Sequence, residues 1–392
     1  SWMKDEKRKS NFPLGLMGAK SYIHREPLGV VGMISPWNFP MYLSLAPLAG
    51  IFSAGNQVMH KPSEFTPITS ELLKEICDSA FDETEFATFL GGPDVGAAFT
   101  QLKFDHLLFT GSGNIGKHVM RAASENLVPL TLELGGKSPV IVSDSSNLEI
   151  TARRVMFNKT LNAGQICLAP DYVYVHETQK DNFVEACKDQ VNEFYSDLKY
   201  NPDYTSVINQ KHYDRLNGLL TDAKDHGAEL VEINPANEDF SQQESHKIPP
   251  TLVLNPTDEM QIMKEEIFGP LLPIKTYKDI NEPINYINKN DKPLGLYYFG
   301  NNKNEETKVV NSTTSGGVTV NDIMGHIQQN ELGFGGVGPS GMGKYDGFDG
   351  FMNFSNNKPI YKQIGFRLDK FLDAIRPPYK GSIENVLEKL LK

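Results

Sequence analysis

The alternation of short apolar runs with amphipathic runs from residue 29 onward most restricts how this chain can fold. GVVGMIS (29–35) and NQVMHKP (56–62) predict strands, and YLSLAPLAGIFSAG (42–55) predicts a helix that ends on glycine. TPITSELLKEICDSAF (66–81) predicts a second helix, with Thr66 as its cap and Pro67 in its first turn. Strand–helix–strand order at this spacing favours a parallel sheet with helices on both faces. The sequence therefore predicts a doubly wound α/β nucleotide-binding domain, with ligands at the carboxyl ends of its strands.

A second alternating block follows GGKSP, near which (135–138) we place a domain boundary. Its expected strands are 139–144, 172–176, 269–277, 294–300 and 316–322, and its expected helices are 147–161 and 179–195. The polar stretch 231–249 predicts an exposed excursion, and ENVLEKLLK (384–392) a short amphipathic helix. This second block predicts a second α/β domain.

Composition narrows the function classes. With 392 residues the chain can form two domains, and its net charge of −11 gives no support for nucleic-acid binding. No apolar run approaches the roughly 18 residues of a membrane span. The first residues resemble no signal peptide, and three scattered cysteines favour a reducing compartment, so a cytoplasmic location is expected. Because position 1 is not Met, we expect a fragment or a processed form.

One of the three cysteines has unusual neighbours. Cys77 and Cys187 fall in step with apolar residues at helical spacing, which predicts small core residues. Cys167 instead lies in NAGQICLAPD, between turn-forming residues and a proline. It could be a core residue, half of a disulfide, a metal ligand or a nucleophile. Nine dispersed histidines and the lack of HExxH or CxxC argue against a metal site.

A glycine-rich loop points to a nucleotide. GSGNIG (111–116) follows an expected strand and opens an expected helix, and Glu133 lies about 20 residues further on. Such a loop suits a phosphate at a helix N-terminus, with the acidic residue on the adenosine ribose. The alternative is an ordinary glycine turn between a strand and a helix. The motif alone leaves the two interpretations about equal.

Further short motifs follow the expected strands. PWNFP (36–40) offers Asn38 as a neutral donor for an oxyanion, although a loop-capping role is the more common one for such a residue. KPSE (61–64) offers a cation and a carboxylate at a strand end, and EEIFGP (265–270) places carboxylates beside an aromatic ring. Each motif is weak by itself.

Together and in this order, these segments resemble the aldehyde dehydrogenase superfamily. The matching stretches, from about residue 20 to 360, are PWNFP, KPSE, GSGNIG, LELGGKSP, NAGQICLAP, EEIFGP, PLGLYYFG, GGVTVND and FGGVGPSGMG. CLAPDYVYV and FGGVGPSGMGKYDG resemble its class-3-type branch most, and bacterial coniferyl-aldehyde dehydrogenases in particular. The resemblance implies oxidation of an aldehyde, aromatic or medium-chain, to its acid with NAD or NADP as the cofactor.

The resemblance also assigns roles by position. It makes Cys167 the nucleophile, Glu133 the general base and Asn38 the oxyanion donor, and it moves the ribose-binding carboxylate from Glu133 to Glu64. The cofactor-binding residues that it implies are Ser35, Pro36, Trp37, Lys61, Ser63, Glu64, Gly111, Ser112, Ile115, Leu134, Glu266 and Phe268. By position beside Asn38 and Cys167, the expected substrate residues are Phe39, Tyr42, Leu43 and Ile166, with a core role for Tyr42 and Leu43 as the alternative.

The resemblance implies four parts and a homodimer. They are an N-terminal segment with an oligomerisation hairpin (1–28, the hairpin being 11–27), an NAD(P)-binding domain (29–135), a catalytic domain (136–336), and a C-terminal segment (337–392) that returns to the NAD domain and the dimer interface. Family members carry some tens of helical residues before the counterpart of Ser1. Gly113 and Gly333 depart from the family pattern, which has Thr or Ser and Pro there.

Two rival functions remain open from the residues. The first is a cofactor-independent cysteine acyl-transfer enzyme, for which His326 is the nearest candidate base. The second is a non-catalytic protein on the same fold, against which the presence of Cys167, Glu133 and Asn38 argues.

Overall fold

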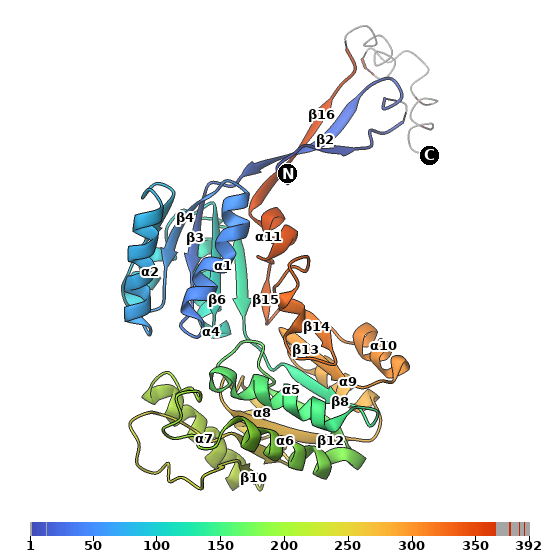
Figure 1. Ribbon diagram of the computed structural model, residues 1–392. Coiled ribbons are helices and arrows are strands. Elements are labelled where there is room, and N and C mark those ends of the chain that lie inside the picture. The colour runs from blue at the N-terminus through green and yellow to red at the C-terminus, as the bar shows by residue number, and fades with distance from the viewer. Residues whose placement is uncertain (1, 13, 366–375, 378–383, 385–387, 389–392) are drawn as a thin grey trace. The chain divides into compact units, whose positions relative to one another are not determined.

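The protein divides into two compact units, residues 1–27 with 355–392, and residues 28–354. The computed structural model describes residues 2–12, 14–365, 376, 377, 384 and 388. In the first unit, β2 (Lys20–Pro27) is the central strand of an antiparallel sheet between β1 (Glu6–Arg8) and β16 (Ser355–Lys362) (Figure 1). Residues 11–27 thus supply one strand and the turn before it, rather than both strands of a hairpin.

The second unit contains a six-stranded sheet that confirms the expected parallel nucleotide-binding core. The strand order is β15 (Gly341–Met342), β7 (Leu130–Leu134), β6 (His106–Gly111), β3 (Val30–Ile34), β4 (Gln57–Lys61) and β5 (Phe86–Thr88). All neighbours are parallel except β15, which pairs antiparallel with β7 and sets Gly341 opposite Glu133. The connecting helices are α1 (Pro40–Ser53), α2 (Pro67–Ala80), α3 (Pro93–Phe99) and α4 (Gly113–Ser124). Parallel pairing brings the loops after β3, β4, β6 and β7 to one edge.

One helix start differs from its prediction. Thr66 stands at the N-cap of α2 and Pro67 at its first position, as expected, but the Thr66 side chain makes no capping hydrogen bond. The backbone at Thr66 has φ −125° and ψ 61°, and its hydroxyl oxygen is buried without a partner among the described residues. The helix therefore begins on the fixed φ of Pro67.

A seven-stranded sheet forms the rest of the second unit. Its order is β10 (Glu229–Glu232), β11 (Thr251–Leu254), β12 (Leu271–Tyr277), β9 (Tyr172–His176), β8 (Pro139–Val142), β13 (Gly295–Phe299) and β14 (Gly317–Val320), parallel except for β10. Its helices are α5 (Leu148–Thr160), α6 (Lys180–Phe194), α7 (Gln210–Asp225), α8 (Gln261–Lys264), α9 (Asn281–Lys289) and α10 (Lys303–Ser312), and α11 (Gly347–Asn353) follows near the end of the unit (Figure 1). The sequence patterns missed α7, α8, α9, α10, α11, β10 and β11.

The polar stretch 231–249 is only partly exposed. Ile233, Lys247 and Ile248 in it are buried, and Lys247 Nζ donates to the backbone oxygens of Leu198 and Asn201 at 3.0 and 2.7 Å. Both ends of the stretch are therefore packed against the second unit. The polar composition alone did not indicate this burial.

The cores and the link between the sheets explain how the site is built. Cys77 and Cys187 are 2% and 0% exposed, which confirms both as core residues. β7 ends at Leu134 and β8 begins at Pro139, so four residues pass from one sheet to the other.

The four-part domain division stays a prediction. The expected helix at 384–392 lies outside the described residues, apart from single positions, and no described helix is long and apolar enough to cross a membrane.

Candidate active site

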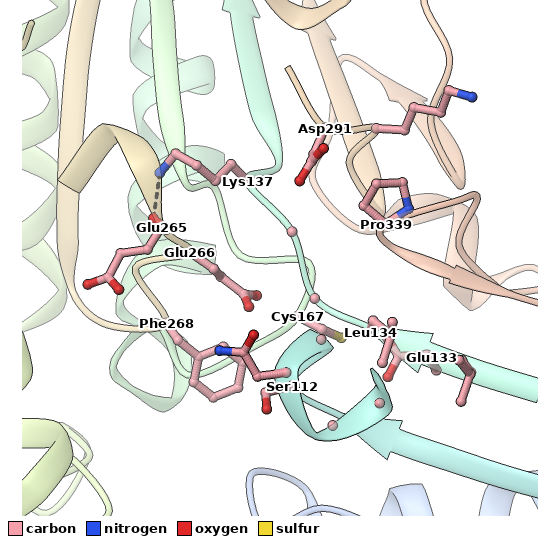
Figure 2. A pocket seen from close by; sticks show the side chains of 18 of the residues that line it. Ser112, Glu133, Leu134, Lys137, Cys167, Glu265, Glu266, Phe268, Asp291 and Pro339 are labelled. Atoms are coloured by element: carbon pink, nitrogen blue, oxygen red, sulfur yellow. Dashed lines mark hydrogen bonds between the residues drawn. The ribbon is translucent and has the colours of Figure 1, made fainter. Parts of the chain in front are cut away.

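A pocket of about 960 Å³ lies at the edge where β6 and β7 end and the loops of the seven-stranded sheet begin. Figure 2 shows Cys167, Leu134 and Glu133 toward one side of this pocket, and Lys137, Glu265, Glu266 and Phe268 toward the other. The sequence-predicted residues that line it are Pro36, Trp37, Asn38, Leu43, Gly111, Ser112, Glu133, Leu134, Cys167, Glu266 and Phe268. Segments spread over more than 200 positions of the sequence thus meet in one place.

The turn before Cys167 has an unusual backbone. Asn162, Ala163 and Gly164 have φ values of 49°, 51° and 71°, so three successive residues are left-handed. A Cβ on Gly164 would lie 2.3 Å from the backbone oxygen of Gly269, so only glycine fits there. The chain after α5 therefore turns sharply and presents Cys167 to the pocket.

Hydrogen bonds hold this turn in place. Gln165, which is 2% exposed, donates from Nε2 to the backbone oxygens of Asn162 (2.9 Å) and Ser206 (3.0 Å), and its Oε1 accepts from Ile208 N at 3.0 Å. Asn162 Nδ2 donates to the backbone oxygen of Asn38 at 3.0 Å. The NAGQ residues are thus the fastening of the loop, which explains polar side chains beside a cysteine.

Glu133 and Cys167 lie side by side in the pocket. Glu133 is 2% exposed on β7, next to the Cys167 thiol, and its Oε1 has no hydrogen-bond partner among the described residues. Burial raises the pKa of Glu133 to about 8, and the nearby thiol partly offsets this. Burial, followed by the Glu133 and Glu266 carboxyl groups, raises the pKa of the Cys167 thiol. Both members of the pair therefore hold their protons tightly.

Asn38 lies beside the loop that carries Cys167. Its Nδ2 donates to the backbone oxygen of Gln165 at 3.1 Å, and its own backbone oxygen accepts from Asn162. One of its two amide hydrogens is thereby committed to the loop. The same hydrogen bond fixes the Asn38 side chain at the pocket wall, because its acceptor, Gln165, is only two positions before Cys167.

Glu266 and Phe268 reach the pocket from the loop after α8. Burial, followed by Asp171, raises the pKa of Glu266 to about 8, and its Oε1 is buried without a hydrogen-bond partner in the described part of the chain. Both Glu266 carboxylate oxygens lie 2.2 Å from where a Cβ on Gly135 would stand. Phe268 has φ 48° and packs edge-on against Trp37, with ring centroids 5.5 Å apart. A side chain at position 135 would therefore displace the Glu266 carboxyl group from its present place.

The pocket residues fit a dinucleotide. The end of β6 at Gly111 and the start of α4 at Ser112 and Gly113 line the pocket, and Ser112 is the N-cap residue, accepting from Ile115 N at 3.4 Å. A helix N-terminus favours a phosphate, and no atom lies within 4 Å of a Cβ built on Gly113. The partnerless Glu266 Oε1 is a further acceptor that a ribose hydroxyl would satisfy.

Other expected cofactor residues lie outside the pocket lining. Ser35 is buried, and its hydroxyl bonds to Ser44 Oγ (2.7 Å) and His60 Nε2 (2.8 Å), so this side chain is engaged within the core. Lys61 Nζ pairs with Glu64 Oε2 at 2.8 Å, and Ser63 Oγ accepts from Phe65 N at 3.2 Å. Ile115 is 52% exposed on α4.

The four expected substrate residues do not act as one wall. Leu43 lines the pocket, Ile166 is buried in the core with Phe39 packed against that core, and Tyr42 is 56% exposed. Helical spacing explains the difference, because Tyr42 and Leu43 are neighbours on α1 and point to different faces.

Four residues of the site were missed from the sequence. Lys137, His212 and Arg215 line the pocket, and buried Asp171 binds Lys137 just behind it. Lys137 is the lysine of LELGGKSP and Asp171 is the aspartate of CLAPDYVYV, so both belong to motifs that the sequence analysis had recognised. His212 and Arg215 lie on α7, whose pattern gave no functional signal.

His326, the candidate base of the acyl-transfer alternative, does not line this pocket. Its Nδ1 bonds to Thr319 Oγ1 at 2.8 Å, and burial lowers its pKa to about 4. The geometry therefore offers Glu133, rather than His326, as the titratable partner of Cys167. No group of three or more potential metal ligands occurs among the described residues.

Comparisons with known proteins identify the class of enzyme. The model of the "Aldehyde dehydrogenase family" matches residues 2–360. A "Probable coniferyl aldehyde dehydrogenase" of Caulobacter vibrioides is 55% identical over 392 residues, which cover 100% of this chain and 81% of that protein. A "Coniferyl aldehyde dehydrogenase" of a Pseudomonas species is 52% identical over 390 residues, covering 100% and 80%.

Solved structures agree with this match. The substrate-bound structure of Staphylococcus aureus AldH superposes with a TM-score of 0.90 at 39% identity, covering 100% of this chain and 82% of that one. Betaine aldehyde dehydrogenase of Staphylococcus aureus, solved in complex with NAD+, gives a TM-score of 0.81 at 28% identity, covering 92% and 71%.

This chain belongs to the aldehyde dehydrogenase family. It is an oxidoreductase of the NAD(P)-dependent kind that converts aldehydes to acids, which confirms the predicted family, fold and cofactor class. Among its relatives are coniferyl aldehyde dehydrogenases at 48% to 55% identity and class 3 aldehyde dehydrogenases at about 40%.

Proposed function

We propose that this enzyme oxidises aromatic aldehydes of the coniferyl type, with Cys167 as nucleophile, Glu133 as base and NAD as the preferred cofactor. The observation that carries the proposal is the meeting of the Cys167 thiol, the buried Glu133 carboxyl group and the first turn of α4 in one pocket. The names of the two bacterial relatives support the substrate class.

Cys167 starts the reaction by attacking the carbonyl carbon. The thiolate is the reactive form, so the proton of the thiol must leave first, and Glu133 is the neighbouring acceptor. Because the two groups are close and both hold protons tightly, they titrate as a coupled pair. The product of the attack is a tetrahedral thiohemiacetal on Cys167.

The oxyanion of this intermediate needs hydrogen-bond donors. The backbone N–H of Cys167 and the second amide hydrogen of Asn38 are the groups available at the loop. A preorganised donor of this kind typically contributes about 10²–10³ in rate. The hydrogen bond from Asn38 Nδ2 to the Gln165 backbone oxygen keeps the amide from rotating away, and the bond from Asn162 holds the Asn38 backbone.

NAD(P)+ supplies the acceptor for the hydride that leaves the tetrahedral carbon. Trp37, Ser112, Glu266 and Phe268 are the pocket residues that would hold it, through the start of α4, an acidic acceptor and two aromatic rings.

Glu133 completes the cycle. Loss of hydride leaves an acyl thioester on Cys167, and the ionised Glu133 carboxylate takes a proton from the water that hydrolyses it. Because burial raises the Glu133 pKa to about 8, the fraction of active base increases as the pH rises toward and through that value. Hydrolysis is therefore expected to be faster in mildly alkaline solution.

We further propose a homodimer in the cytoplasm. The first unit, with its three-stranded antiparallel sheet, contains residues 11–27, which resemble the oligomerisation arm of the family, and this supports a role in assembly. Three cysteines without disulfide partners support a reducing compartment.

A substrate panel tests the proposal. Coniferyl aldehyde, hexanal and acetaldehyde are followed at the NADH absorbance band, with NAD and with NADP. We expect the highest kcat/KM for coniferyl aldehyde with NAD. A higher kcat/KM for acetaldehyde would contradict the substrate class, and the absence of NADH with every aldehyde would contradict the whole proposal.

A further inference from the structure

An ion pair between buried Asp171 and the pocket-lining Lys137 touches all three loops that carry the functional groups of the pocket. Asp171 is 3% exposed, and its Oδ1 pairs with Lys137 Nζ. Asp171 is four residues after Cys167, and Lys137 is four residues after Glu133. The pair therefore ties the nucleophile loop directly to the strand end that carries the base.

The same two side chains also hold the Glu266 loop. Asp171 Oδ2 accepts from Ile267 N at 2.9 Å, and Lys137 Nζ donates to the backbone oxygens of Ile262 (2.8 Å) and Glu265 (2.9 Å). Figure 2 shows Lys137 reaching across to Glu265 above Glu266. Both oxygens of Asp171 and three donor directions of Lys137 are thus used between loops.

Backbone contacts reinforce the junction. Asp171 N donates to the Ser138 backbone oxygen at 2.9 Å. Lys159, which is 1% exposed on the last turn of α5, donates from Nζ to the Pro170 backbone oxygen at 2.8 Å. The end of the nucleophile loop is therefore fixed on two sides by groups that do not line the reacting centre.

We propose that Asp171, acting through Lys137, is a positioning residue that sets the spacing of Cys167, Glu133 and Glu266 for the reaction. A buried ion pair is weak support for stability as such, because removing two charges from water costs about as much as their attraction returns. Here the ion pair fixes the relative positions of the loops, since each oxygen of the Asp171 carboxylate binds a different loop. The inference rests on the proposed roles of Cys167 and Glu133.

The test uses Asp171→Asn, which keeps the shape and removes the charge, with Glu305→Gln as the matched control. Glu305 accepts from Ser143 Oγ (2.7 Å) and Tyr298 OH (3.0 Å) at the other side of the same sheet, away from the pocket. The two variants and the wild type are compared by thermal unfolding, by the NADH burst in rapid mixing, and by alkylation of Cys167 with iodoacetamide in the absence of cofactor.

We expect Asp171→Asn to slow the burst by about 10²-fold at full amplitude, the usual cost of misplacing a reacting group by about 1 Å. A merely structural role would lower the amplitude, because fewer sites would be folded, and leave the rate per site unchanged. We also expect several-fold faster alkylation, since the loosened loop exposes the thiol. Glu305→Gln should leave burst rate and alkylation unchanged.

Lys137→Met and the double variant complete the test. If the two side chains act as one unit, the double variant should be no slower than the slower single variant, because the shared contact is lost only once. An unchanged burst rate, unchanged alkylation or strictly additive losses would each overturn the proposal. The alkylation measurement needs neither cofactor nor aldehyde, so it tests Asp171 even if the proposed substrate fails.

Discussion

Glu133→Gln is the change from which the structure predicts most. The pKa of the wild-type carboxyl group is raised from 4.5 to about 8, because the group is buried. The folded protein therefore binds this proton more tightly than the unfolded chain. The stability that Glu133 contributes is fully present below about pH 4.5 and is lost as the pH rises through about 8. Glutamine has the same shape and no such pH dependence.

The size of this effect follows from the pKa shift. At about 1.4 kcal/mol per pKa unit, the shift corresponds to an upper limit of about 5 kcal/mol, and water entering the pocket reduces it. The variant should therefore gain stability relative to the wild type as the pH rises. We expect the difference in unfolding free energy, variant minus wild type, to be larger at pH 9 than at pH 5 by more than about 1.4 kcal/mol, the equivalent of one pKa unit. Urea unfolding at the two pH values measures it, with Glu305→Gln as the control. Equal pH dependence in variant and wild type would refute the burial argument.

The same variant separates the two sequence interpretations of Glu133. If Glu133 is the base, steady-state turnover should fall by about 10²–10⁴-fold. A burst of NADH close to one per active subunit should remain, and cofactor affinity should barely change. The burst rate must be recorded with its amplitude, because loss of a proton acceptor for Cys167 would slow it. A large rise in the NAD dissociation constant, with thioester hydrolysis untouched, would return Glu133 to the ribose.

Three further outcomes are expected. Cys167→Ala should abolish oxidation with cofactor affinity nearly unchanged, and aldehyde should protect this cysteine from alkylation; peptide mapping that places the inactivating label on Cys77 or Cys187 would contradict this, since both are buried. NAD should have a lower KM than NADP, because the Glu64 carboxylate would repel a 2′-phosphate while Lys61, its ion-pair partner, offsets part of the repulsion; the reverse order of KM would remove this role from Glu64. A cinnamyl-type aldehyde and hexanal should be better substrates than acetaldehyde, and equal kcat/KM for all three would leave the apolar approach through Leu43 without support.

Local patterns in the sequence were sufficient for most of the framework. Apolar runs with β-branched residues predicted β3, β4, β8, β9 and β13, because strands buried on both faces of a parallel sheet have little choice of residue. Helices with a clear apolar side, such as α2 and α6, were found within one or two residues of their ends. In contrast, α7 carries only Leu216, Leu219 and Ala223 as buried residues among many polar ones, and its helical period was overlooked.

The residues of the site likewise fall into those that the sequence identified and those that only the structure could place. The sequence alone singled out Cys167, since turn-forming and polar neighbours are inconsistent with a core position, and the family motifs pointed to Glu133, Asn38 and Glu266. It could not separate Leu43, at the pocket, from Tyr42, which is more than half exposed, because that depends on how α1 is rotated against its neighbours. It also could not show that the Ser35 hydroxyl is taken up by Ser44 and His60.

What the sequence determined, then, is the chemistry available: a thiol in a turn, a carboxyl group at a strand end, and a helix that starts with glycine and serine. Tertiary structure alone decided which of these groups share a pocket and what their pKa values become. Both depend on contacts between distant segments, such as the pairing of Asp171 with Lys137 and the approach of Glu266 to Gly135. Burial acts through space, so a carboxyl group with an ordinary sequence context acquires a pKa of about 8 only when the two sheets close around it.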